Sequence, residues 1–281
     1  MRLPLNSVQA HARAFLAFAI WTVLAGATPA FAGAFNVAEG AGDISLTNTY
    51  ETAFQRFDKN GVARAMPRFQ SYQPQLIVNY GFTDWLMLTV KRQDQFIFSA
   101  ASLGPPAQRG VASSFGTNEV GLQARLWKGE SAVVALQGTW RELNFDKSVA
   151  FVPVGRAAND FDTRLLAGYT FKLFGLAASI DAQTGYRIRS NAPNEWRGDY
   201  SLSIKADDKW RFSLQSLNFL AASSPAPALS KFIPLSQAKV QGNVFYAFAS
   251  GWAAQFGLFD VYAGSDIRAN YGAVLGVTRK F

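Results

Sequence analysis

Basic side chains recur at alternate positions of this sequence, in phase with other polar residues, and they form its strongest chemical signal. Lys and Arg side chains that ring a pore favour anions, and a low-dielectric wall focuses their field. If the segments that carry these basic residues surround one interior, the pattern predicts a lumen for small anionic solutes, such as acidic sugars or aromatic acids. The candidate lumen-lining residues are Lys91, Arg125, Arg141, Arg164, Arg187, Lys205, Arg211 and Lys239.

Acidic residues share this phase and leave a second interpretation open. With Lys172 and Lys280 included, ten bases on this phase face five acids. Acids and bases that pair across an interior hold it rigid and satisfy one another without selecting a solute. The sequence is therefore compatible with an anion-attracting lumen and with a paired, mostly closed one. The five acids are Glu51, Glu119, Asp162, Asp181 and Asp199.

The sequence lacks the residue types on which most catalytic mechanisms depend. The chain has no Cys, and its one His, His11, lies in a segment predicted to be removed on export. Cys and His nucleophiles and bases and zinc sites of the usual thiolate and imidazole type are therefore excluded. We expect no enzyme activity, no cofactor and no metal, and only a Ser-Lys arrangement stays open. The basic residues are scattered, so nucleic acid is not an expected partner.

The N-terminus has the order of a secretory signal peptide over residues 1–32. Residues 1–13 contain Arg2 and Arg13 and no acidic residue, and an apolar run follows over 14–27. Ala30-Phe31-Ala32 then supplies small residues before a cleavage site. The apolar run is shorter than the ~20 residues of a spanning helix. Residues 33–42 are predicted to form a flexible periplasmic lead-in, with a plug in the lumen as the alternative.

The rest of the chain, 43–281, alternates apolar and polar residues in short segments. Such alternation, with short and long connections taking turns, is typical of an antiparallel transmembrane β-barrel with an apolar outside and a polar inside. A soluble β-sandwich also alternates, but its apolar faces meet each other. The sequence predicts an all-β barrel of about twelve strands, near 43–55, 67–80, 85–98, 116–127, 131–142, 161–172, 175–188, 198–206, 210–220, 234–247, 252–262 and 269–281.

Two motifs resemble those of bacterial outer-membrane barrels. The last strand places Tyr271, Val277 and the terminal Phe281 on one face, and it is similar to the C-terminal signal that the barrel-assembly machinery recognises. The hairpin Tyr80-Gly81-Phe82-Thr83-Asp84-Trp85-Leu86 is similar to a turn of putative outer-membrane transporters of the phenol meta-degradation pathway type. These resemblances imply a barrel in outer-membrane lipid that serves as a narrow channel or transporter for a small solute. The alternative is a non-conducting structural or surface barrel linked to exopolysaccharide or adhesion.

Overall fold

The computed structural model describes residues 33–99, 111–145, 158–190, 192–222 and 235–281. The predicted signal peptide, 1–32, lies outside the described residues. In the part of the chain that is described, no helix is long and apolar enough to cross a membrane.

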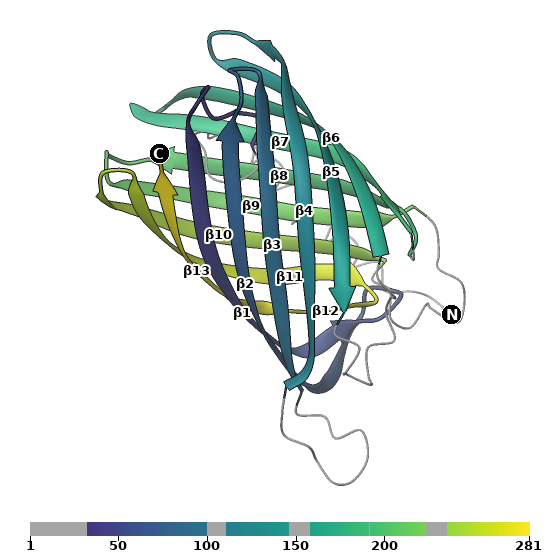
Figure 1. Ribbon diagram of the computed structural model, residues 1–281. Coiled ribbons are helices and arrows are strands. Elements are labelled where there is room, and N and C mark those ends of the chain that lie inside the picture. The colour runs from purple at the N-terminus through teal and green to yellow at the C-terminus, as the bar shows by residue number, and fades with distance from the viewer. Residues whose placement is uncertain (1–32, 100–110, 146–157, 191, 223–234) are drawn as a thin grey trace, which may run out of the picture.

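The strands form one closed antiparallel barrel, and the predicted all-β fold is confirmed (Figure 1). Neighbours along the chain pair with each other, and pairing of β1 with both β2 and β13 closes the sheet. Twelve strands build the wall, as predicted, while the two-residue β12 only pairs with the far end of β1. The strands are β1 (Gly42–Phe57), β2 (Ala63–Gly81), β3 (Leu86–Ser99), β4 (Val111–Lys128), β5 (Ala132–Phe145), β6 (Ala158–Leu173), β7 (Leu176–Arg189), β8 (Glu195–Lys205), β9 (Trp210–Ala221), β10 (Ser236–Ala249), β11 (Trp252–Ser265), β12 (Ile267–Arg268) and β13 (Tyr271–Lys280).

The two ends of the barrel differ in their connections. At one end, here called the short-turn end, the strands are joined through 82–85, 129–131, 174–175, 206–209 and 250–251. The other, the long-loop end, holds the remaining connections. Phe281 lies at the short-turn end, where it exchanges backbone hydrogen bonds of 2.9 and 3.0 Å with Gly42. The start of the first wall strand and the end of the last one therefore lie together at the short-turn end, as an even number of wall strands requires.

The outside of the barrel is apolar and the inside is polar. On β4, Leu122 is 51% exposed while its neighbour Gln123 is fully buried. The same contrast separates Phe161, 43% exposed, from the buried Asp162 on β6. A sandwich would bury the apolar set, so this arrangement decides for a membrane-spanning barrel, whose apolar band faces lipid.

A β-bulge explains one residue that the alternation misplaced. Strict alternation puts Trp127 on the inward phase, but the pairing of β4 with β5 shifts register between Arg125 and Trp127. The extra residue, Leu126, turns the following side chain outward, and both Leu126 and Trp127 are more than half exposed. A bulge thus re-aims an aromatic side chain toward lipid near the short-turn end.

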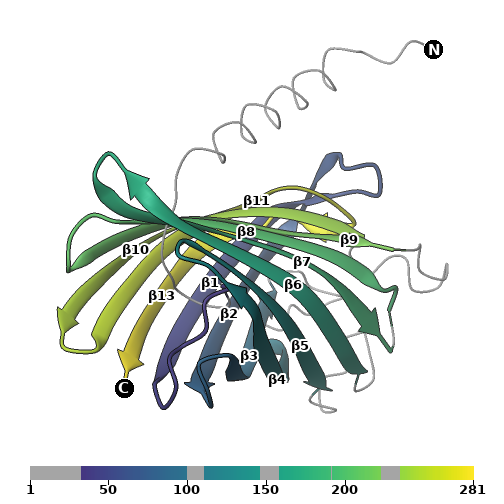
Figure 2. The same cartoon turned by 90° about the horizontal axis from the view of Figure 1, so that it is seen from above.

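The segment ahead of β1 turns back into the space that the strands enclose (Figure 2). Ala34 is fully buried against Val133, Ala135 and Leu166, and Phe35 packs beside them. These wall residues are apolar although they lie on the inward phase, so they give the segment a surface to bury. The sequence favoured a flexible lead-in over 33–42; in the structure its first residues pack inside the barrel, and Gly42 already belongs to β1.

Candidate lumen site

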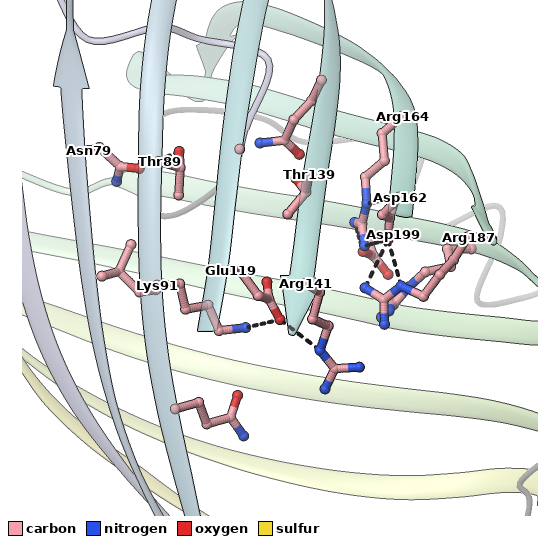
Figure 3. A pocket seen from close by; sticks show the side chains of 15 residues that line it. Asn79, Thr89, Lys91, Glu119, Thr139, Arg141, Asp162, Arg164, Arg187 and Asp199 are labelled. Carbon is pink, nitrogen blue, oxygen red and sulfur yellow. Dashed lines mark hydrogen bonds and ion pairs between the residues drawn. The ribbon is translucent and has the colours of Figure 1, made fainter. Parts of the chain in front are cut away.

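A cavity of about 370 Å³ lies against the inner wall formed by β2 to β8 (Figure 3). Every strand of this stretch contributes at least one side chain, because inward positions of adjacent strands lie side by side. Charged groups dominate the lining, with amides and hydroxyls between them. The charged lining residues are Lys91, Glu119, Arg141, Asp162, Arg164, Arg187, Arg197 and Asp199.

Asp162 is the centre of the first group of ion pairs in this cavity. Arg164 binds it through two parallel contacts, from Nε at 2.9 Å and from Nη2 at 3.1 Å. Arg187 donates to the same carboxylate from Nε at 3.0 Å, and its Nη2 lies 2.8 Å away. Arg164 also reaches Asp199 at 2.6 Å. Bidentate and charge-assisted contacts of this kind are geometrically restrictive, so they hold the two guanidinium groups in place.

Glu119 is the centre of a second group, across β3 to β5. Lys91 Nζ lies 3.5 Å from its Oε1, and Arg141 Nε lies 3.1 Å from the same atom. Among the described residues Arg141 Nε has no hydrogen-bond partner, so this contact is an ion pair without hydrogen-bond alignment. Arg141 Nη1 also reaches Asp160 Oδ2 at 3.5 Å. The group is therefore looser than the one around Asp162.

A third group continues toward the long-loop end. Arg189 contacts Glu195 closely and lies 3.9 Å from Asp160. Arg197 lies 4.0 Å from Glu195, and its Nε has no hydrogen-bond partner within the described part of the chain. Across the three groups, six bases (Lys91, Arg141, Arg164, Arg187, Arg189 and Arg197) stand against five acids (Glu119, Asp160, Asp162, Glu195 and Asp199).

The acids lie deeper than the bases in these groups. In every one of their ion pairs the basic side chain is the more exposed partner. Arg141 is 21% exposed while Asp160 is 2% exposed, and Arg197 is 22% exposed while Glu195 is 8% exposed. The acids thus stand against the wall and the cations project over them. A near-neutral cluster therefore presents mainly positive groups to the cavity.

The structure gathers half of the predicted lumen-lining residues at this cavity. Lys91, Arg141, Arg164 and Arg187 line it, whereas the other four lie elsewhere. Arg125 precedes the bulge in β4, and Lys205 ends β8, where it pairs with the exposed Asp208 at 2.6 Å. The last two stack on aromatic rings: Arg211 lies 4.2 Å from the centroid of Phe245, and Lys239 lies 3.9 Å from that of Phe259.

Sequence reasoning missed four charged residues of these groups for one reason. Arg189 follows the predicted end of its strand, and Asp160, Glu195 and Arg197 precede the predicted starts of theirs. The strands in fact extend further toward the long-loop end, to Arg189 on β7 and from Glu195 on β8. The signal was present, because each missed residue keeps the inward phase of the neighbouring predicted segment.

The predicted assembly-signal residues lie on β13 and at its end. Tyr271 and Phe281 are exposed, 45% and 55% respectively, and Val277 is half-buried. The Thr83 side chain organises the other recognised motif: its hydroxyl accepts the backbone N–H groups of Trp85 and Leu86 at 3.3 and 3.0 Å. A hydroxyl that replaces backbone acceptors in this way fixes a tight turn.

Solved structures of outer-membrane channels share this fold. The COG4313 outer-membrane channel from Pseudomonas putida is similar at a TM-score of 0.65 and 13% identity, over 90% of this chain and all of that one. The KdgM porin in complex with disordered oligogalacturonate (TM-score 0.52, 9% identity) matches 84% of this chain and 99% of its own. The NanC porin (TM-score 0.52, 8% identity) matches 84% of this chain and all of its own.

No protein-family model matches the sequence, and no curated protein matches it. At such low identity the structural likeness establishes the fold of outer-membrane barrels and does not transfer a binding site. Among the described residues, no group of three or more His, Cys, Asp or Glu side chains is placed to hold a metal ion.

Proposed function

We propose that this protein is an outer-membrane channel for small anionic solutes. We place the short-turn end in the periplasm and the long-loop end outside the cell, because outer-membrane barrels have short periplasmic turns and longer extracellular loops. A solute that enters from the long-loop end meets the charged cavity of β2 to β8 and moves along its cations.

The layering of the ion pairs carries this proposal. Acids that lie against the wall fix the guanidinium groups, and the exposed edges of Arg141 and Arg197 remain toward the cavity. A carboxylate solute can exchange its water for these planar donors, which match carboxylate geometry. Because each cation already has an acid behind it, the contact is weak enough for release, which conduction requires.

Acidic sugars and aromatic acids are the solutes that we propose. The KdgM porin was solved with oligogalacturonate, an acidic sugar oligomer, and a similar fold here supports testing that class. The hairpin Tyr80–Leu86 resembles that of transporters linked to phenol meta-degradation, which supports testing aromatic acids. Both classes offer a carboxylate to the same guanidinium groups.

A reversal-potential measurement in planar bilayers tests the proposal. Under a KCl gradient we expect anion preference, and Arg197→Gln should reduce it. Lys209→Gln removes the same charge from an exposed turn and should leave the preference unchanged. Galacturonate should block the current more strongly than galactose, which has the same ring without the carboxylate. Cation preference, or equal block by the two sugars, would refute an anion channel.

A non-conducting structural barrel is the second candidate, and one observation favours it. Every charged side chain of the three ion-pair groups has an oppositely charged partner, so the lumen is mostly paired, and residues 33–36 occupy part of the interior. Absence of conductance from protein whose gel migration still shifts on heating would establish this alternative, because the barrel would then be folded and closed.

A further inference from the structure

Asp181 on β7 differs from the other inward-facing acids of β2 to β8. It is buried, with 6% exposure, and faces the first described residues of the chain. Its carboxylate accepts the backbone N–H of Ala34 at 2.8 Å. Among the described residues no Lys or Arg forms an ion pair with it, whereas Glu119, Asp162 and Asp199 each have one. A buried carboxylate without a cation is costly, so its environment calls for a positive charge.

Gly33 lies directly against this carboxylate. A Cβ built on Gly33 would come within 2.7 Å of Asp181 Oδ1. The backbone nitrogen of Gly33 is one covalent bond from the same Cα. As part of a continuing chain this nitrogen is a neutral amide, but as a chain terminus it is an ammonium group. Gly33 is also the residue that follows the predicted cleavage motif Ala30-Phe31-Ala32.

We propose that the mature chain begins at Gly33 and that its α-ammonium group forms a buried ion pair with Asp181. Hydrolysis of the Ala32–Gly33 peptide bond by a signal peptidase consumes one water and leaves a carboxylate on Ala32 and an ammonium on Gly33. The new charge supplies the cation that Asp181 lacks. Export processing thus adds an ion pair to the contacts that hold residues 33–36 inside the barrel.

The contacts around Gly33 are suited to hold a chain terminus in a fixed position. Gln123 Nε2 donates to the Gly33 carbonyl at 3.0 Å and to Asn36 Oδ1 at 2.9 Å. The next residue, Ala34, is buried in the apolar cluster of β5 and β6. The ring of Phe35 occupies the space beside Gly168, where a Cβ would lie 2.6 Å from it. The segment is therefore held by hydrogen bonds, apolar contact and shape, and the ion pair completes these contacts.

Chemical labelling of the N-terminal amine tests the proposal without any conductance measurement. Purified folded protein should have the intact mass of a chain that starts at Gly33. Its N-terminal peptide should be acylated at least about tenfold more slowly at neutral pH than in urea-unfolded protein, since a group protected by native structure reacts through local opening. Asp181→Asn should bring the rate close to the unfolded one, whereas Asp208→Asn, which changes an exposed acid, should not.

A second variant separates the ion pair from the Ala34 hydrogen bond. Insertion of Ser-Gly between Ala32 and Gly33 moves the ammonium away from Asp181 and keeps the N–H of Ala34. It should accelerate labelling as Asp181→Asn does, and the two changes together should give no further acceleration, because they remove the same pair. A different mature start, rapid labelling of the folded wild type, or additive effects would overturn the proposal. Heat-modifiable gel migration verifies that each variant is folded. These results do not depend on conductance, so a failure of the channel proposal would leave them unchanged.

Discussion

Replacement of Asp162 by Asn should weaken the barrel and strengthen its anion preference at the same time. Asp162 is 2% exposed and holds two guanidinium groups, with contacts of 2.9 and 3.1 Å to Arg164 and of 2.8 and 3.0 Å to Arg187. Removal of one partner from a buried ion pair costs about 3–5 kcal/mol. Asn keeps one oxygen acceptor, so we expect about 3 kcal/mol of lost unfolding free energy.

The effect on selectivity follows from the lost charge. An anion that contacts Arg164 on the cavity side would lie about 6 Å from the carboxylate, one contact length beyond the guanidinium. Even at the dielectric of water, a unit charge at this distance contributes about 0.7 kcal/mol, or roughly threefold in the permeability ratio. The low-dielectric wall makes this a lower bound.

Two assays on the same variant check these values. Urea unfolding in lipid vesicles, followed by tryptophan fluorescence, gives the stability, and the reversal potential in planar bilayers gives the selectivity. Asp208→Asn, at an exposed turn, is the matched control and should change neither. A folded Asp162→Asn barrel with unaltered selectivity would refute our assignment of the cavity as the solute path. Unaltered stability would refute the buried ion pairs themselves.

Three further predictions concern other parts of the chain. Gly168→Ala places a methyl group where the Phe35 ring lies 2.6 Å away; overpacking of this kind costs about 1–3 kcal/mol, and limited proteolysis of the N-terminal segment should become faster. Phe281→Ala should lower the yield of folded barrel in the membrane fraction, measured by heat-modifiable migration, because the terminal aromatic is the predicted assembly signal. The N–H of Val62 and the guanidinium of Arg64 lower the pKa of Asp58 at the long-loop end. The stabilisation of this turn should therefore be present above the ordinary pKa of 3.8 and be lost as pH falls through the lower folded value, which the Val62 amide resonance would report by NMR.

Alternation predicted the wall of the barrel because it is a local property. Each residue on a strand faces lipid or lumen according to its position alone, so the faces of β4 and β6 were readable from single segments. Strand ends were less readable, because the neighbouring residues in the sequence, such as Ser190 and Asn194, are polar like the lumen face. Arg189 and Glu195 lie next to such residues, and four of the eleven charged residues of the network were missed.

Features that depend on a long-range partner were not readable in advance. The bulge at Leu126 is visible only in the pairing of β4 with β5, although two adjacent apolar residues mark a change of phase. The place of Ala34 and Phe35 depends on Leu166 and Val133, which are distant in sequence. Apolar residues on an otherwise polar inward phase were the available signal, since they require an apolar occupant.

The lumen holds its cations by two different means, and this determines how the excess of bases acts. On the β2 to β8 side, guanidinium groups stand over carboxylates, so each positive charge is largely compensated. Outside this network, Lys239 lies 3.9 Å from the centroid of the Phe259 ring, and Arg268 lies 4.0 Å from that of Phe69 on β2. In the described chain neither forms an ion pair within 4.0 Å, although the buried Glu51 attracts both. An aromatic face holds a cation without neutralising it. Ion pairs therefore rigidify the network, while the two ring-held cations add positive charge that no ion pair within 4.0 Å compensates among the described residues.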